Sequence, residues 1–367
     1  MQIDFANLKI QHNLYKEEIE EAILKVARDC NFIMGSQIDE LERNLEKFTG
    51  SKYAISCSSG TDALLLAMMA LDIQPDDEII TTPFTFFATA ETIAFLKAKP
   101  VFVDIDEKTY NIDPKKIEEK ISSKTKAIIP VSLYGQPCDM DEINQIAKKH
   151  NLKVIVDGAQ SFGSTYKGIS DSNLGDISCT SFFPAKPLGC YGDGGALFTN
   201  DEKLADKIKS LRLHGQSIRY HHQYIGMGGR LDTIQAAVLN VKLKYYPKDL
   251  KLRQDVASKY TQALNAKNIE TPFVKNDRTS AWAQYSIRVQ NRTELQTKLQ
   301  NLGIPTAIHY PMPLHLQECF KYLNLKEGDF PISEKVSKEI MSLPMNPYVT
   351  DEEIEFIVGS LAKELKC

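Results

Sequence analysis

An α/β fold with a mainly parallel sheet and a second, smaller domain is expected for this chain. From about residue 50, short apolar and β-branched runs alternate with amphipathic stretches, a pattern that builds a parallel sheet covered on both faces. After about Arg230 the pattern changes to long charged helices. Because 367 residues exceed what one core usually organises, we expect a large domain over residues 1–245 and a small α+β domain over residues 246–367.

The large domain is expected to contain a series of short strands separated by helices. Each strand is an apolar run bounded by turn or helix signals. The expected strands are Tyr53–Ser56, Glu78–Thr82, Pro100–Asp104, Lys126–Pro130, Lys153–Asp157, Ser178–Phe182 and Gly195–Thr199. Amphipathic helices are expected between them, among others at Asp141–His150 and Asp201–Leu211.

The small domain is expected to be mostly helical, with one strand at Gln284–Val289. The last helix has the clearest start, because Thr350 can cap it and Glu353 follows three residues later. The expected helices are Leu231–Tyr246, Lys248–Asn265, Arg292–Leu302, Ser333–Met341 and Asp351–Leu365.

Charge and hydropathy exclude several classes of partner. The chain has 44 basic and 48 acidic residues, a net charge of −4, and neither sign is gathered into a long run. Nucleic acid and membrane are therefore not expected as partners. The first residues include Asp4 and lack the basic and apolar regions of a signal peptide, and the apolar run Ala63–Leu71 is too short to cross a bilayer.

The cysteines and histidines show no metal-binding pattern. The seven cysteines are an odd number and form no Cys-x-x-Cys pair, so we expect reduced thiols in a cytoplasmic protein. The seven histidines lack the His-Glu-x-x-His spacing of a zinc helix. No metal site is expected.

The first segment that indicates chemistry is Ser58-Ser59-Gly60-Thr61-Asp62, which precedes an apolar helix. Small residues at a helix start leave backbone N–H groups free, and the helix dipole favours a phosphate there. A simple helix cap by Ser59 is the alternative explanation.

Two later segments place reactive side chains at one edge of the expected sheet. Asp157 ends an apolar strand, where a buried carboxylate needs a cation such as a protonated pyridine nitrogen, although a simple cap is also common at a strand end. Lys186 follows another strand between Pro184 and Pro187, and desolvation there would lower its pKa and expose a nucleophilic amine. The glycine-rich turn Gly192-Asp-Gly-Gly lets the backbone pass close to whatever the lysine holds.

Together and in this order, these segments resemble the DegT/DnrJ/EryC1/StrS group of sugar aminotransferases. The resemblance runs nearly end to end and is carried by the Asp157 and Lys186 segments together with Phe5-Ala-Asn-Leu, Ser59-Gly-Thr-Asp-Ala, Pro83-Phe-Thr-Phe-Phe-Ala-Thr and Ile308-His-Tyr-Pro. It implies the fold type I architecture, pyridoxal 5'-phosphate (PLP) as cofactor, and a homodimer with its sites at the subunit interface.

The resemblance also implies a role for individual residues. Lys186 would form the Schiff base with PLP and Asp157 would pair with the pyridine nitrogen. The other implied cofactor contacts are Gln160 to the ring hydroxyl, Phe86 stacked on the ring, and Gly60, Thr61 and Ser181 at the phosphate. L-glutamate would give its amino group to the cofactor, and the aminated cofactor would then aminate a ketone on a nucleotide-linked sugar.

One segment departs from the family pattern. Relatives commonly carry asparagine in a Gly-x-Asn-x-Arg segment that reaches the cofactor phosphate of the neighbouring subunit. Here the segment reads Gly226-Met-Gly228-Gly-Arg230, so Gly228 has no side chain for that contact.

The acceptor implied by the resemblance is a UDP-linked 3-keto-N-acetylhexosamine used for cell-surface polysaccharide or lipid A. In the uronate enzymes, the residues matching Arg230, His309 and Tyr310 address the C6 carboxylate, and an arginine fork suits a carboxylate. A C6 hydroxymethyl group or the diphosphate would also suit these residues, and Arg230 could equally form a structural ion pair. A dTDP-linked 3- or 4-keto-6-deoxyhexose is the alternative acceptor.

Two other classes of protein are considered. Asp104-Ile-Asp106 resembles the metal-binding Asp-x-Asp of glycosyltransferases, but a polar turn accounts for it, since acidic residues are routine in turns. The second alternative is a non-catalytic PLP-binding regulator or a dehydratase on the same scaffold. A dehydratase would lack the lysine, and Lys186 is present.

Overall fold

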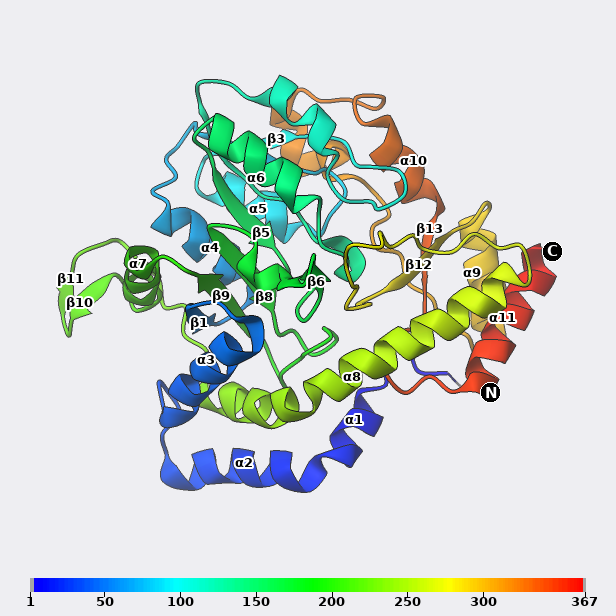
Figure 1. Cartoon of the computed structure of the whole chain (residues 1–367), viewed down its shortest axis with the longest axis horizontal. Helices are drawn as coiled ribbons and strands as arrows, with labels where there is room; N and C mark the ends of the chain where they lie inside the picture. The colour runs from blue at the N-terminus through cyan, green and yellow to red at the C-terminus, as the bar shows by residue number, and fades with distance from the viewer. Residues whose placement is uncertain (1–2, 366–367) are drawn as a thin grey trace.

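The computed structural model of the protein describes residues 3–365 and is built around a seven-stranded sheet (Figure 1). The strand order is β1-β9-β8-β5-β4-β2-β3. The strands are β1 (Tyr53–Cys57), β2 (Glu78–Thr81), β3 (Lys99–Phe102), β4 (Thr125–Ile128), β5 (Lys153–Asp157), β8 (Ile177–Ser181) and β9 (Gly195–Thr199). Each expected strand is present, with its ends displaced by a few residues at most, and the predicted α/β fold is confirmed.

Six of these strands run in one direction and β9 runs against them. β9 is antiparallel because the loop after β8 turns back directly, so that Ser181 pairs with Gly195. The neighbouring pair of β5 and β8 is parallel, and Asp157 lies opposite Cys179. The carboxyl ends of β5 and β8 therefore meet at one edge of the sheet, beside the loop that follows β8.

Alternating side chains explain why helices cover both faces of the sheet. In β1, Ile55 packs in one core with α4 and α7, whereas Ala54 packs in another core with α3. In β9, Leu197 and Phe198 divide between the same two cores. The helices of this domain are α1 (Leu8–Leu14), α2 (Lys16–Asp29), α3 (Ser36–Thr49), α4 (Gly60–Ala70), α5 (Ala88–Phe95), α6 (Met140–Lys149) and α7 (Glu202–Arg212). Because both faces of the sheet are buried, successive residues of each strand are apolar.

The long helix α8 corrects the prediction of two helices meeting near residue 247. It runs without interruption over Thr233–Asn265 and contains Pro247. Proline removes only one N–H donor, and packing holds both halves: Leu239 lies in the core beneath the sheet, and Tyr260 lies in the core of the C-terminal part. The domain boundary between residues 245 and 246 falls inside this helix and stays a prediction.

The C-terminal part contains a second small sheet. Strand β12 (Tyr285–Arg288) was expected, but its partner β13 (Ile340–Leu343) was not. The predicted helix Ser333–Met341 ends at Glu339, because Ile340 and the next residues are buried as an extended strand against β12. The remaining α-helices are α9 (Arg292–Asn301), α10 (Pro331–Glu339) and α11 (Asp351–Leu365). Two hairpins lie earlier in the chain, β6 (Thr165–Tyr166) with β7 (Ile169–Ser170) and β10 (Gln216–Ile218) with β11 (His221–His222).

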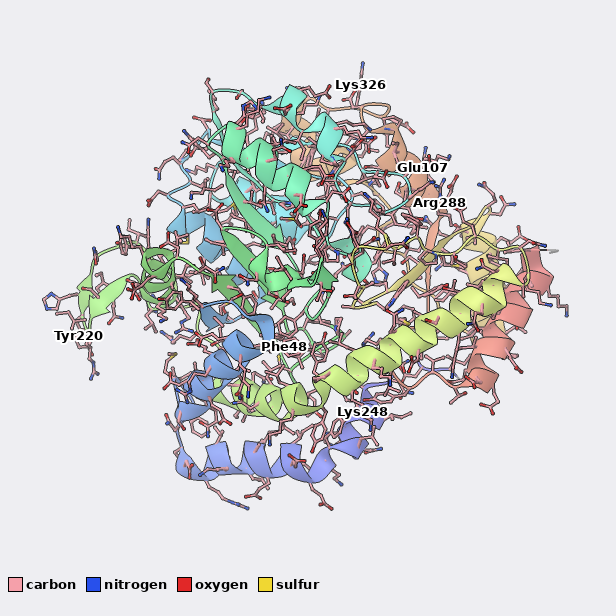
Figure 2. All side chains as sticks on the ribbon, in the orientation of Figure 1. Phe48, Glu107, Tyr220, Lys248, Arg288 and Lys326 are labelled. Carbon is pink, nitrogen blue, oxygen red and sulfur yellow. The ribbon has the colours of Figure 1, made fainter. Side chains whose placement is uncertain are left out.

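Side-chain hydrogen bonds cap the last helix and connect β12 to the loop after β3. The cap predicted for α11 is present, because Thr350 Oγ1 accepts from Glu353 N at 3.2 Å and Glu353 Oε2 accepts from Thr350 N at 2.8 Å. Arg288 on β12 donates to Glu107, which lies in the loop after β3, at 3.0 Å (Figure 2). No helix within residues 3–365 is both long and apolar enough to cross a membrane.

Candidate active site

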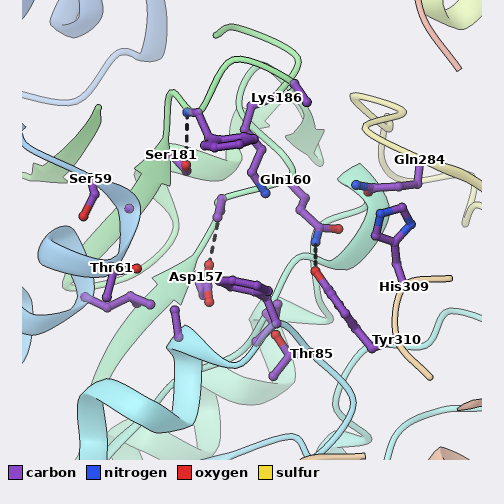
Figure 3. Close-up of a pocket in the computed structure, with 18 of the residues that line it drawn as sticks. Ser59, Thr61, Thr85, Asp157, Gln160, Ser181, Lys186, Gln284, His309 and Tyr310 are labelled. Atoms are coloured by element: carbon purple, nitrogen blue, oxygen red, sulfur yellow. Dashed lines mark hydrogen bonds between the residues drawn. The ribbon is translucent and has the colours of Figure 1, made fainter. Parts of the chain in front are cut away.

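A cavity of about 490 Å³ lies at the carboxyl edge of the sheet (Figure 3). Its walls come from the start of α4, the end of β5, the loop after β8 and a loop of the C-terminal part. Nine of the ten residues proposed from the sequence line it: Gly60, Thr61, Phe86, Asp157, Gln160, Ser181, Lys186, His309 and Tyr310. Arg230 does not line this cavity.

Asp157 provides a buried carboxylate without an ion-pair partner in the described residues. The side chain is only 5% exposed. Its Oδ2 accepts from Thr89 Oγ1 at 2.7 Å and its Oδ1 accepts from Ala159 N at 3.2 Å. Burial raises the pKa of this carboxyl above its ordinary value. A cation entering the cavity would therefore find an acceptor already oriented, which fits a protonated pyridine nitrogen.

Lys186 faces the same cavity from the loop after β8. Its backbone N donates to Phe183 O at 2.8 Å, which closes the turn that carries the side chain. Burial lowers the pKa of the amine, and the negative charge of Asp157 opposes this shift. Within residues 3–365 the amine has no hydrogen-bond partner, so it can become a neutral nucleophile.

The start of α4 forms the part of the cavity that suits a phosphate. Ser59 caps the helix, because its Oγ accepts from Asp62 N at 3.0 Å. The N–H groups of Gly60 and Thr61 have no acceptor among the described residues. Glycine is required here, since a Cβ on Gly60 would lie 2.7 Å from Ser181 Cβ. The capping role and the phosphate role proposed for this segment are thus compatible, and an anion at this end would meet free N–H groups.

Gln160 connects the two sides of the cavity. Its Oε1 accepts from Tyr134 N at 2.7 Å and its Nε2 donates to the Tyr310 hydroxyl at 2.9 Å. Burial and the negative charge of Asp157 raise the pKa of Tyr310, so its hydroxyl keeps its proton. Gln160 is therefore held in one orientation by partners from both parts of the chain.

His309 is held as a neutral ring. Its Nδ1 lies 2.9 Å from Ser342 Oγ on β13. Burial lowers the pKa of His309 to about 4, and the nearby positive charge of Lys186 acts in the same direction. The ring therefore presents hydrogen-bonding nitrogens to the cavity without adding a charge.

Several residues of the site were not predicted from the sequence. Thr89 supports Asp157 and in turn lies 3.0 Å from Thr85, which lines the cavity. Asp193 and Gln284 also line it. Thr85, Thr89 and Asp193 lie within segments that carry the family resemblance, where a polar residue beside the site could have been noted. Gln284 was counted only as the first residue of a strand.

The segment Gly226–Arg230 lies beside the phosphate end but outside the cavity. Gly229 O accepts from Ser58 N at 3.0 Å. A Cβ on Gly228 would lie 3.1 Å from the His214 ring, so the imidazole occupies the space next to this glycine. The Arg230 guanidinium forms no ion pair or hydrogen bond within residues 3–365. The structure therefore does not bring Arg230 together with His309 and Tyr310 within one chain.

The Asp104-Ile-Asp106 segment is a polar turn. Asp104 caps α10, because its Oδ2 accepts from Ile332 N and its Oδ1 from Ser333 N, both at 3.0 Å. Asp106 accepts from Thr109 N at 2.8 Å within its own turn. Across the described residues, no cluster of histidine, cysteine, aspartate or glutamate side chains could hold a metal ion.

A lysine that faces a buried, unpaired carboxylate, with free helix N–H groups at one end of the cavity, defines a fold type I PLP enzyme. Comparison with protein families identifies the family within this class. Residues 13–362 match the DegT/DnrJ/EryC1/StrS aminotransferase family. The chain belongs to this family, and the predicted class of PLP-dependent nucleotide-sugar aminotransferase is confirmed.

Three relatives illustrate the range of names in the family. The chain is 49% identical to UDP-2-acetamido-2-deoxy-3-oxo-D-glucuronate aminotransferase of Pseudomonas aeruginosa, covering 98% of this chain and 99% of the relative. It is 43% identical to a pleiotropic regulatory protein of Geobacillus stearothermophilus, over 99% and 98%. It is 42% identical to dTDP-3-amino-3,6-dideoxy-alpha-D-galactopyranose transaminase of Aneurinibacillus thermoaerophilus, over 98% of each.

Solved structures agree with this assignment. The DesV protein of S. venezuelae, in complex with a ketimine intermediate, is 32% identical and superposes with a TM-score of 0.97 over 100% of this chain and 99% of that chain. NtdA of Bacillus subtilis, with bound cofactor PMP, is 31% identical, with a TM-score of 0.92 over 100% and 86%. The predicted cofactor, PLP, is thus confirmed for the family to which this chain belongs.

Proposed function

We propose that this enzyme transfers the amino group of L-glutamate to C3 of a UDP-linked 3-keto-N-acetylhexosamine. The observation that carries the chemistry is the Lys186 amine facing the unpaired Asp157 carboxylate across one cavity. The choice of sugar is supported by the 49% identical relative, whose name specifies a UDP-linked 3-oxo sugar. The 42% identical relative has a dTDP-linked sugar in its name, also with the nitrogen at C3, and supports a dTDP-linked acceptor as the second candidate.

In this proposal the described residues would hold PLP at four points. Gly60, Thr61 and Ser181 would hold the phosphate, and Asp157 would keep the pyridine nitrogen protonated. Gln160 would contact the ring hydroxyl, and Phe86 would stack on the ring. When bound, PLP supplies an electron sink for the charge that develops at the reacting carbon.

Lys186 then has two tasks. Its amine would hold the cofactor, and once free it would act as the neutral base that moves the proton at the substrate carbon. The lowered pKa favours the neutral form that this step requires. The neutral His309 ring and the protonated Tyr310 hydroxyl provide donors and acceptors for the sugar without competing for the proton.

The C6 group of the acceptor is tested with Arg230→Lys. If the natural acceptor carries a C6 carboxylate, the variant should lose the two-pronged hydrogen bond, at a cost of roughly 1.5–3 kcal/mol. Since about 1.4 kcal/mol is a factor of ten, kcat/KM should fall at least about tenfold for the uronate and much less for the C6 hydroxymethyl sugar.

The measurement is single-turnover amination with wild type and Arg230→Lys on both UDP-linked 3-keto sugars, and with wild type on dTDP-linked keto sugars. Equal losses on the two acceptors would assign Arg230 to the diphosphate or to the structure. Amination of dTDP-linked keto sugars only would favour the second candidate over the UDP-linked acceptor.

We further propose that the protein is a homodimer in which Arg230 acts in the partner's site. Arg230 lies outside the cavity of its own chain. Beside it, Thr233 N donates to Phe32 O at 3.0 Å, and the adjoining Phe32, Ile33 and Met34 are exposed at 45%, 51% and 36%. An exposed apolar segment next to an unpaired cation suits contact with another chain.

Mixed dimers of Lys186→Ala and Arg230→Ala chains test this arrangement. If Arg230 acts across the interface, each mixed dimer contains one site with both residues intact, and co-expressed chains should recover about a quarter of wild-type activity. Tagged purification and a sugar amination assay would measure it. No recovery, or a fully active monomer in sedimentation, would contradict the cross-subunit role.

The same proposal includes the use of the product and the location of the enzyme in the cell. An aminated UDP-sugar of this kind is a building block for cell-surface polysaccharide or lipid A. The four buried cysteines Cys57, Cys138, Cys179 and Cys190 are all free thiols, which supports a cytoplasmic location.

A further inference from the structure

Lys242 on α8 is a buried cation without an acidic partner. Its side chain is only 3% exposed, and no carboxylate of residues 3–365 forms an ion pair with it. Within the same residues, the amine donates only to a backbone carbonyl, Gly189 O, and the Tyr191 ring lies 5.3 Å from Nζ. A buried charge with so few partners costs stability, so an apolar side chain at this position would be no less stable. Stability alone therefore does not explain a lysine here.

The carbonyl that Lys242 contacts belongs to the loop that carries Lys186, residues 182–194 between β8 and β9. In this loop, Lys186 N donates to Phe183 O at 2.8 Å. The chain also crosses itself at Gly189, where a Cβ would lie 2.4 Å from Pro184 O. Because Gly189 packs directly on the turn before Lys186, a shift of Gly189 displaces the turn from which the Lys186 amine faces the cavity.

Helix α8 contacts this loop through apolar and polar side chains. Leu188 of the loop packs with α8 in the core beneath the sheet. Apolar contacts have no preferred direction, so they hold the loop against the helix without fixing its orientation. Gln235 adds a directed contact at the far end of the loop, where its Oε1 accepts from Tyr191 N at 2.8 Å. Lys242, through Gly189 O, provides the directed contact nearer to Lys186.

We propose that Lys242 is a positioning residue, which donates to Gly189 O and thereby fixes the loop so that the Lys186 amine faces Asp157 across the cavity. This inference rests on the role proposed for Lys186 and does not depend on which sugar is aminated. Lys242 does not line the cavity, so it acts through the loop and touches neither cofactor nor substrate. Loss of its amine should therefore slow every step that uses Lys186, whichever substrate is bound.

Lys242→Met separates positioning from stability. Methionine has an unbranched side chain of similar length and removes both the charge and the donor. We expect the melting temperature to stay equal or rise, because the variant no longer buries an unpaired charge. The rates of both half-reactions, with L-glutamate and with the keto sugar, should fall about tenfold or more, while each KM stays within about twofold, because a displaced catalytic group slows chemistry more than binding. Cofactor absorbance in single turnover measures the rates.

Hydrogen exchange gives a readout that does not depend on activity. The Lys186 amide is protected within the loop by its hydrogen bond to Phe183 O. With PLP bound to both proteins, a peptide covering residues 183–190 should exchange at least about fivefold faster in Lys242→Met than in wild type, in keeping with the loss of one hydrogen bond from a charged group. Exchange in β5, which carries Asp157, should not change.

Arg253→Met is the matched control. Arg253 is also a buried cation on α8, 6% exposed, and it forms no ion pair within residues 3–365. Like Lys242, it donates to a backbone carbonyl, Trp282 O at 3.0 Å, but this partner lies in the core of the C-terminal part. Arg253→Met should leave the exchange of residues 183–190 and both half-reaction rates within about twofold of wild type.

The outcomes are distinguishable. If Lys242→Met fails to fold or melts earlier than wild type, or if Arg253→Met slows the half-reactions equally, Lys242 is structural and the inference is wrong. If loop exchange and both rates match wild type, or if only one half-reaction slows, this inference fails and the proposed function stands. If borohydride reduction of wild type labels a lysine other than Lys186, the role proposed for Lys186 fails and the inference fails with it.

Discussion

Lys186→Ala should abolish amino transfer, with a loss on the order of 10⁴-fold, the upper range of what a positioned acid–base group contributes. The variant removes the amine that faces Asp157, and no other lysine of residues 3–365 lines the cavity. Because the backbone turn at residue 186 is closed by Phe183 O rather than by the side chain, the fold should remain intact. Turnover with glutamate and a keto sugar measures the loss, and circular dichroism checks the fold.

Lys242 is the lysine against which this assignment must be tested. Burial lowers the pKa of Lys242 to about 8, so it too could be a reactive amine. However, its Nζ donates to Gly189 O, and it does not line the cavity. Borohydride reduction of wild type followed by peptide mapping should label Lys186. A label on Lys242, or a labelled Lys186→Ala variant, would overturn the assignment.

Asp157→Asn should keep the fold and reduce turnover by about 10²–10³-fold, similar to the loss of one preorganised electrostatic group. The asparagine can still engage Thr89, but it provides no negative charge for the pyridine nitrogen. Thermal melting gives a second readout. Because a buried unpaired carboxylate is costly without cofactor, the variant without PLP should melt no earlier than wild type, and PLP should stabilise wild type more than the variant.

The pH dependence of folding stability is a further test of the Asp157 carboxyl. Burial raises the pKa of Asp157 in the folded state, so without PLP the folded protein binds a proton more firmly than the unfolded chain. Stability should therefore fall as pH rises from the ordinary aspartate pKa through the raised one, and Asp157→Asn should lose this contribution. Asp171→Asn is the control, since burial raises the pKa of Asp171 to about 6 but this side chain lies outside the cavity. Asp171→Asn should keep the full stabilisation by PLP. If Asp157→Asn and Asp171→Asn lose the same amount of stabilisation by PLP, the pairing of Asp157 with the ring is contradicted.

The sheet was predictable from the sequence because each strand is buried on both sides. A strand such as β5, with Ile155 in one core and Val154 in another, must be apolar at successive positions, and this pattern is visible without a structure. Strand β13 was not predictable in this way. Its residues follow a helix directly, and pairing with β12 on one side and with Ala307 on the other keeps them extended. The continuity of α8 through Pro247 likewise depends on packing at both ends.

The site was predictable where one local segment carries both the residue and its setting. Asp157 ends a strand, and Lys186 follows a strand between two prolines, so each could be placed at the sheet edge. Gln284 depends on contacts that join distant parts of the chain, and no local pattern distinguishes it from any other strand residue. Arg230 shows the opposite case, because the family resemblance assigned it to the sugar, but it does not line the cavity of its own chain.

The pairing of β1 with β9 has a consequence for synthesis on the ribosome. β1 borders only β9, and Tyr53 must wait for Thr199 before it can join the sheet. The phosphate end depends on the same event, since Gly195 packs so closely on Ser59 that a Cβ there would lie 2.4 Å from Ser59 O. Such a distant pairing forms late, because the chain between the partners must be ordered first. A nascent chain that ends before β9 therefore keeps an unpaired apolar strand, so we expect this stretch to need protection from aggregation until residue 199 has emerged.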